Sequence, residues 1–117
     1  MKRLLALSMA LVLCAGLTLA AAQTARAAEY FLSDGVIVTG AATGESASLE
    51  ELRAVGAAVR IPVIVGSGIT AENAAAYAPL ADALVVGSYF KHGGDWKNPL
   101  DAGRIRAVLA AVEGAEP

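Results

Sequence analysis

The chain has 117 residues, 56% of them hydrophobic, which is enough for one globular domain with a core. Nine basic residues stand against eleven acidic ones, and no basic cluster follows Lys2-Arg3, so the sequence argues against nucleic-acid binding. Cys14 is the only cysteine and His92 the only histidine, so the sequence predicts no disulfide framework, no metal site and no cofactor.

The N-terminal segment, residues 1–22, has a basic start followed by a long apolar run. With the Ala-x-Ala pattern that ends at Ala27, it has the form of a secretory signal peptide. The alternative is a helix over residues 23–32 that runs into the first strand, with an apolar face made of Ala27, Ala28, Phe31 and Leu32. Signal cleavage would destroy that helix. We therefore favour the helix and a cytoplasmic chain, with export through a signal peptide ending at Ala27 as the alternative.

Three short apolar runs, at residues 36–38, 63–65 and 84–86, predict strands that are buried on both faces. Residues 34–40 and 82–88 share one sequence pattern: an acidic residue, a small residue, an apolar strand and small turn residues. Repeated βα units wind into a doubly wound sheet or a closed barrel, and both carry functional loops at the carboxyl ends of the strands. Three strands cannot close an eight-stranded barrel. Either the chain is a fragment, or it forms a homo-oligomer that covers its sheet edges.

Helix signals lie between these strands and after the last one. Ser48 with Glu51 predicts a capped helix that ends near Arg60. Thr70 predicts the cap of a short helix through Tyr77. A last helix begins at Asp101, and its predicted apolar side consists of Ile105, Val108, Leu109 and Val112. The alternation of helices and strands indicates an α/β fold.

Two glycine-containing turns follow the second and third strands. Glycine lets the backbone approach an anion closely, and adjacent last strands of a barrel commonly combine two such loops around one phosphate. The sequence therefore predicts phosphate binding by Gly66, Ser67, Gly68, Gly87 and Ser88. The alternative is that these glycines only make tight turns.

Other candidates lie on the same predicted rim. Thr39, Gly40 and Thr43 follow the first strand and could contact a substrate, and Lys91 could reach a phosphate as a point charge. Glu45 is the candidate catalytic acid or base, with a solvated loop charge as the alternative. The sequence does not decide whether the protein is an enzyme.

Several of these phrases together resemble the BtpA family (BtpA/SgcQ family) of phosphate-binding TIM-barrel proteins. The matching stretches are residues 27–44, 62–73, 82–91 and 98–101, with Arg104 closing the match. The resemblance implies that residues 23–113 form an incomplete TIM (β/α)8 barrel, made of its C-terminal three βα units. An apolar N-terminal helix or leader at 1–22 would precede this part, and a tail at 114–117 would follow it.

The resemblance also implies a ligand, a phosphorylated small molecule of the sugar-phosphate or nucleotide type. It implies a link to photosystem I biogenesis, and with it association with a membrane complex. No settled reaction comes with the family. Three alternatives stay open: a non-catalytic assembly factor for membrane complexes, an exported small structural protein, and a synthase or isomerase of the phosphate-binding barrel group.

Overall fold

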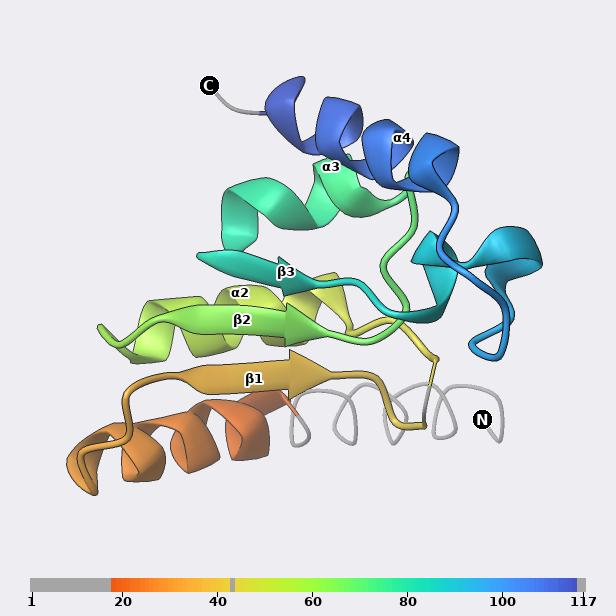
Figure 1. The fold of residues 1–117 in the computed structure, drawn as a ribbon. Coiled ribbons are helices and arrows are strands. Elements are labelled where there is room, and N and C mark those ends of the chain that lie inside the picture. Colours follow the sequence, from red (N-terminus) through yellow and green to blue (C-terminus); the bar gives the residue numbers. More distant parts are fainter. Residues whose placement is uncertain (1–17, 43, 116–117) are drawn as a thin grey trace, which may run out of the picture.

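The computed structural model describes residues 18–42 and 44–115. A helix covers residues 18–30, and the elements that follow are β1 (Val36–Thr39), α2 (Leu49–Ala58), β2 (Val63–Gly66), α3 (Ala74–Tyr77), β3 (Ala83–Val85) and α4 (Ala102–Glu113). Short 3-10 turns lie at Ala78–Leu80, Ser88–Phe90 and His92–Gly94. The predicted order of helices and strands is confirmed (Figure 1). The predictions for residues 1–17, which include Cys14, and for Thr43 lie outside the described residues.

The strands form one parallel sheet in the order β1-β2-β3. Val36 pairs with Val63, and Ile64 pairs with Ala83, so the register places the carboxyl ends of all three strands at one edge of the sheet. The three arrows point the same way in Figure 1. The predicted parallel α/β architecture is therefore confirmed.

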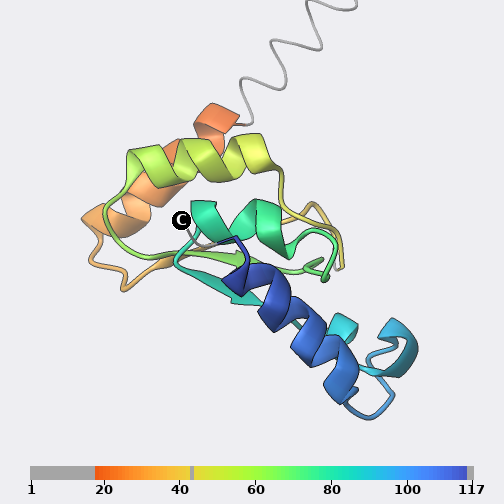
Figure 2. The same cartoon turned by 90° about the horizontal axis from the view of Figure 1, so that it is seen from above.

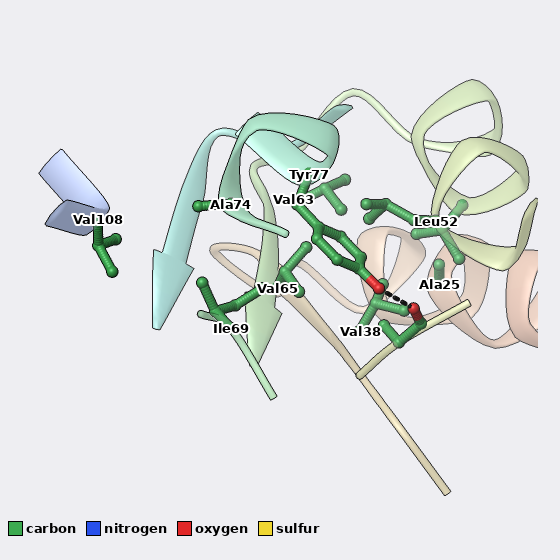
Figure 3. Packing of buried hydrophobic residues seen from close by; sticks show 11 residues of the cluster. Ala25, Val38, Leu52, Val63, Val65, Ile69, Ala74, Tyr77 and Val108 are labelled. Atoms are coloured by element: carbon green, nitrogen blue, oxygen red, sulfur yellow. Dashed lines mark hydrogen bonds between the residues drawn. The ribbon is translucent and has the colours of Figure 1, made fainter. Parts of the chain in front are cut away.

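The two faces of the sheet have different environments. Alternate side chains on one face are buried against the helices, and this core includes Val38, Val63, Val65, Leu52, Val55 and Val108 (Figure 3). The other face, which we call the open face, carries Ile37, Thr39, Ile64, Gly66, Ala83 and Val85, by the alternation of side chains along each strand. Ile37 is 61% exposed and Val85 is 51% exposed. The prediction that the strands are buried on both faces is wrong for the described residues, because no element of this part of the chain covers the open face.

Helix caps follow the sequence signals in two cases out of three. Ser48 accepts the N–H of Glu51 at 3.4 Å, as predicted. Asp101 precedes α4 and accepts the N–H groups of Gly103 and Arg104. Thr70 does not cap α3. The helix begins later, after Asn73, whose Oδ1 accepts the N–H of Thr70 at 2.8 Å.

The helix over residues 18–30 begins earlier and ends earlier than predicted. Its Ala25 is buried in the core, and Glu29 Oε1 accepts the N–H of Arg60 at 2.7 Å, which ties this helix to the turn before β2. The predicted apolar face is wrong. Ala27 is exposed within the helix, and only Ala28 of the four predicted residues is partly buried. Phe31 and Leu32 are exposed because the helix has already ended, and Leu32 adopts a positive φ of 63°. Figure 2 shows this helix beside α2.

The predicted apolar side of α4 is only partly buried. Val108 packs in the core, whereas Leu109 is 54% exposed. Leu109 lines an open apolar groove with Leu84 and Val86, beside the unpaired edge of β3. Over residues 18–42 and 44–115, no helix combines the length and the apolar character needed to cross a bilayer.

Candidate anion-binding site

A pocket of about 350 Å³ lies where β2 and β3 end. It is lined by Gly44, Ser67, Gly68, Ile69, Thr70, Val85, Gly87, Ser88, Tyr89, Gly94 and Arg104. In Figure 1 this is the side toward which the arrowheads point. Four of the five residues predicted to bind phosphate, Ser67, Gly68, Gly87 and Ser88, thus lie in one lining.

The first wall of the pocket is the turn after β2, which has an unusual backbone. Ser67 and Gly68 both have positive φ, 73° and 68°. For Ser67 this left-handed conformation costs roughly 1–2 kcal/mol, and such strain often marks a binding site. A β-carbon on Gly68 would lie 2.5 Å from the backbone nitrogen of Ser46, so only glycine fits there.

Side chains from two other segments brace this turn. Asn73 donates from Nδ2 to the carbonyl oxygen of Gly68 at 2.8 Å, while its Oδ1 accepts the N–H of Thr70. Ser46 donates from Oγ to the same Gly68 oxygen at 2.8 Å. The buried Tyr77 hydroxyl donates to the carbonyl oxygen of Ala47 at 2.6 Å and so fixes the loop that carries Ser46 (Figure 3). The turn is therefore held in a defined shape before any ligand arrives.

The second wall combines the segment after β3 with the first turn of α4. Arg104 is the one charged residue among the described residues that line the pocket. Its Nε donates to the carbonyl oxygen of Tyr89, and its guanidinium carbon lies 4.0 Å from the centroid of the Tyr89 ring. These contacts place a positive charge in a pocket that is otherwise neutral.

Two carboxylates outside the lining interact with Arg104. Hydrogen bonding from its own backbone N–H and from the Thr70 hydroxyl lowers the pKa of Glu72 against an opposing desolvation, and Arg104 and the Tyr89 hydroxyl lower it further. The pKa of Asp101 is also lowered, first by the N–H of Arg104, then by the N–H of Gly103 and by the charges of His92 and Arg104. Both groups are therefore ionised at neutral pH.

Several predicted site residues lie outside the pocket. Gly66 ends β2 on the open face, where it faces Ile37 and Thr39, and Thr39 does not line the pocket either. Gly40 packs against the backbone of Glu45: a β-carbon on Gly40 would lie 2.3 Å from the carbonyl oxygen of Glu45. The Glu45 side chain is exposed and does not reach the lining. Lys91 is engaged through its backbone in an antiparallel bridge with Leu100 and does not line the pocket.

The sequence did not predict Arg104, Tyr89 or Thr70 as lining residues. One signal for Arg104 was present: it lies in the first turn of a helix, where the helix dipole disfavours a cation. His92 is exposed, and its Nδ1 lies 3.2 Å from Asp101 Oδ2. No group of three or more His, Cys, Asp or Glu residues suited to a metal ion occurs within the described part of the chain.

The sequence profile of the BtpA family matches residues 12–114. The chain belongs to the BtpA family. The family expected from the sequence is thus confirmed, and the match extends over all the described elements from the first helix to α4.

Relatives of this BtpA-family chain come from distant organisms. An uncharacterised mitochondrial protein of Caenorhabditis elegans is 51% identical over 90 residues, which are 77% of this chain and 32% of the relative. A protein of Archaeoglobus fulgidus is 44% identical over 74% of this chain and 34% of its own length. The photosystem I biogenesis protein BtpA of Synechocystis is 35% identical over 72% of this chain and 30% of its own length. The chain therefore spans about a third of the length of these relatives.

A solved structure with a similar fold gives a further comparison. It is (S)-3-O-geranylgeranylglyceryl phosphate synthase from Thermoplasma acidophilum, in complex with its substrate sn-glycerol-1-phosphate. The TM-score is 0.62 at 31% sequence identity, over 82% of this chain and 37% of the synthase. That enzyme binds a phosphorylated small molecule.

Proposed function

We propose that this chain binds the phosphate group of a small phosphorylated molecule in the pocket between the turns after β2 and β3. The observation that carries the proposal is the convergence of Ser67, Gly68, Gly87 and Ser88 on one pocket. Small residues let backbone N–H groups approach an anion, and adjacent strand ends of parallel α/β proteins are common phosphate sites. The similar synthase, bound to sn-glycerol-1-phosphate, supports the same ligand class.

We further propose that β1, β2 and β3 correspond to the last three strands of a (β/α)8 barrel. Two facts support this: the aligned segment covers only about a third of the length of the relatives, and β1 and β3 both lie at edges of the described sheet. In a closed barrel the open face would point to the interior. Further strands, from a longer chain or from a second copy, would then cover both edges. Sedimentation analysis of the purified chain tests whether a second copy covers the edges. A chain that stays monomeric at all concentrations would contradict this.

Phosphate-linked stabilisation tests the binding proposal. A ligand that binds only the folded state raises its stability by about 2.7 kcal/mol at a concentration 100 times the dissociation constant. We expect the melting temperature to rise with inorganic phosphate and to remain flat with sodium chloride at matched ionic strength. A flat response to phosphate up to tens of millimolar would rule the proposal out.

A matched pair of variants locates the effect. Ser88→Asp adds a negative charge inside the pocket and should abolish the response to phosphate by repulsion. Ser33→Asp adds the same charge in an exposed segment before β1, at the opposite end of the strands, and should leave the response intact. Equal responses in the two variants would mean that phosphate binds elsewhere.

A second candidate function is a role in assembling membrane complexes. The Synechocystis relative is named as a photosystem I biogenesis protein. The exposed run Tyr30, Phe31 and Leu32, each at least 78% exposed, offers an apolar contact at the end of the sheet away from the pocket. Replacing all three by serine should abolish recovery with membrane extracts if this role holds, and should leave phosphate binding unchanged. Unchanged recovery would argue against the role.

A further inference from the structure

The cation of the pocket occupies an electrostatically unfavourable position. Arg104 is the third residue of α4, and the positive end of the helix dipole disfavours a cation there. Hydrogen bonds, chiefly from backbone N–H groups, lower the pKa values of Asp101 and Glu72, and the nearby Arg104 charge adds a smaller effect. Both carboxylates lie outside the lining, so the guanidinium remains the charge that a ligand in the pocket would meet.

The contacts of Arg104 orient its guanidinium plane. Its Nε is occupied by the carbonyl oxygen of Tyr89, and the Tyr89 ring lies against the guanidinium at 4.0 Å. On another side is Gly94, where a β-carbon would lie 3.4 Å from Nη2. A planar group held in this way loses little further freedom on binding, so its two terminal nitrogens are prepared for two parallel hydrogen bonds.

We propose that Arg104 selects the ligand of the pocket by forming a bidentate contact to the terminal phosphoryl group of a phosphate monoester. This inference rests on the proposed function. Arginine forms paired, charge-assisted hydrogen bonds with phosphate oxygens, which are shorter and stronger than neutral ones. Tyr89 acts as a positioning residue, since it contacts the guanidinium through both its carbonyl oxygen and its ring.

The lining explains the preference for a terminal phosphoryl group. The turn after β2 and the segment after β3 form walls, and Arg104 with Gly94 adds a third side. Val85 belongs both to this lining and to the open face, so the pocket continues toward the open face at that residue. The single substituent of a monoester can extend there and leaves three terminal oxygens for Arg104 and the turn, whereas a diester has only two terminal oxygens and a smaller negative charge.

The test measures affinity by calorimetry on the full chain, with three probes: inorganic phosphate, sn-glycerol-1-phosphate and the diester dimethyl phosphate. We expect the first two to bind the unaltered chain and the diester to bind at least about tenfold more weakly. Arg104→Gln should lower phosphate affinity by about tenfold or more, because charge-assisted hydrogen bonds are lost. Arg106→Gln removes the same charge from an exposed position of the same helix and should have little effect.

Three further variants keep the inference testable if Arg104→Gln fails to fold. Arg104→Lys retains the charge without the planar fork, so it should lose affinity as well. Tyr89→Leu removes the ring and should weaken phosphate binding, whereas Tyr89→Phe retains the stacking and should not.

The outcomes separate the two proposals. If the unaltered chain binds neither phosphate nor the monoester, the proposed function and this inference fall together. If it binds phosphate but Arg104→Gln or Arg104→Lys binds equally well, only the selection by Arg104 is wrong. Equal affinity for the diester would overturn the preference for a monoester.

Discussion

Asn73 should be a main determinant of the shape of the anion pocket, and replacing it with alanine tests this. Its side chain makes two hydrogen bonds of 2.8 Å to the turn after β2, one from Thr70 N–H and one to Gly68 O. An average hydrogen bond contributes about 0.5–1.5 kcal/mol. Ser46 still donates to the Gly68 oxygen in the variant, so the second loss is partly compensated. We expect Asn73→Ala to lower the free energy of unfolding by about 1–2 kcal/mol.

Thermal and urea denaturation measure this loss, and phosphate titration measures its effect on the pocket. For a domain of this size, each kcal/mol lowers the melting temperature by roughly 4–8 °C. Asn98→Ala is the matched control, because it removes a single hydrogen bond from Nδ2 to the carbonyl oxygen of His92 in an exposed loop. Asn73→Asp keeps the acceptor for Thr70 and should recover part of the stability. If Asn73→Ala is as stable as Asn98→Ala and binds phosphate normally, the side chain does not brace the turn.

Three further predictions follow from packing and charge. Leu52 is fully buried, so Leu52→Ala leaves a cavity and should lower the free energy of unfolding by about 2–5 kcal/mol, as measured by chemical denaturation. A loss below about 1 kcal/mol, which is typical of a surface substitution, would contradict the assigned core. Gly56 lies in α2 with open space around it, so Gly56→Ala should raise the free energy of unfolding by roughly 0.5–1 kcal/mol. Gly68 has a positive φ and lies close to Ser46, so Gly68→Ala should lower the free energy of unfolding and weaken phosphate binding. Effects of equal sign on stability would show that backbone conformation does not distinguish the two glycines. Hydrogen bonds from the N–H groups of Arg104 and Gly103 lower the pKa of Asp101 in the folded state below its ordinary value. Its contribution to stability is therefore present above the ordinary pKa and is lost as the pH falls through the folded one. Acid titration of Asp101→Asn should show a shallower loss of stability than the unaltered chain, and identical curves would refute this.

Much of the local structure follows from short stretches of the sequence. The β-branched runs specify β1, β2 and β3, and Ser48 and Asp101 specify helix starts, because a side chain can cap a helix only within a few residues of itself. Two of the predicted turn glycines, Gly68 and Gly87, meet in one pocket because parallel strands end at the same edge of a sheet, whereas Gly66 and Gly40 lie outside it.

Other features were decided only by the tertiary structure. Thr70 was predicted to cap α3, whereas in the structure the Asn73 side chain bonds both the Thr70 N–H and the Gly68 carbonyl oxygen and the helix begins after Asn73. The exposure of Phe31 and Leu32 depends on where the first helix ends and on which elements lie beside it.

The pocket too combines features that the local sequence predicts with features that depend on tertiary contacts. Small turn residues after β2 and β3 were sufficient to predict that these two turns lie together, since that depends on the shared direction of the strands. The identity of the cation was not predictable in this way, because Arg104 is fifteen positions from its partner Tyr89 and reaches the pocket only through the packing of α4 against the segment after β3. The sequence by itself therefore determined the strands, the turns and their common edge, whereas the tertiary structure decided which charge faces the space between them, because that choice depends on contacts between distant segments.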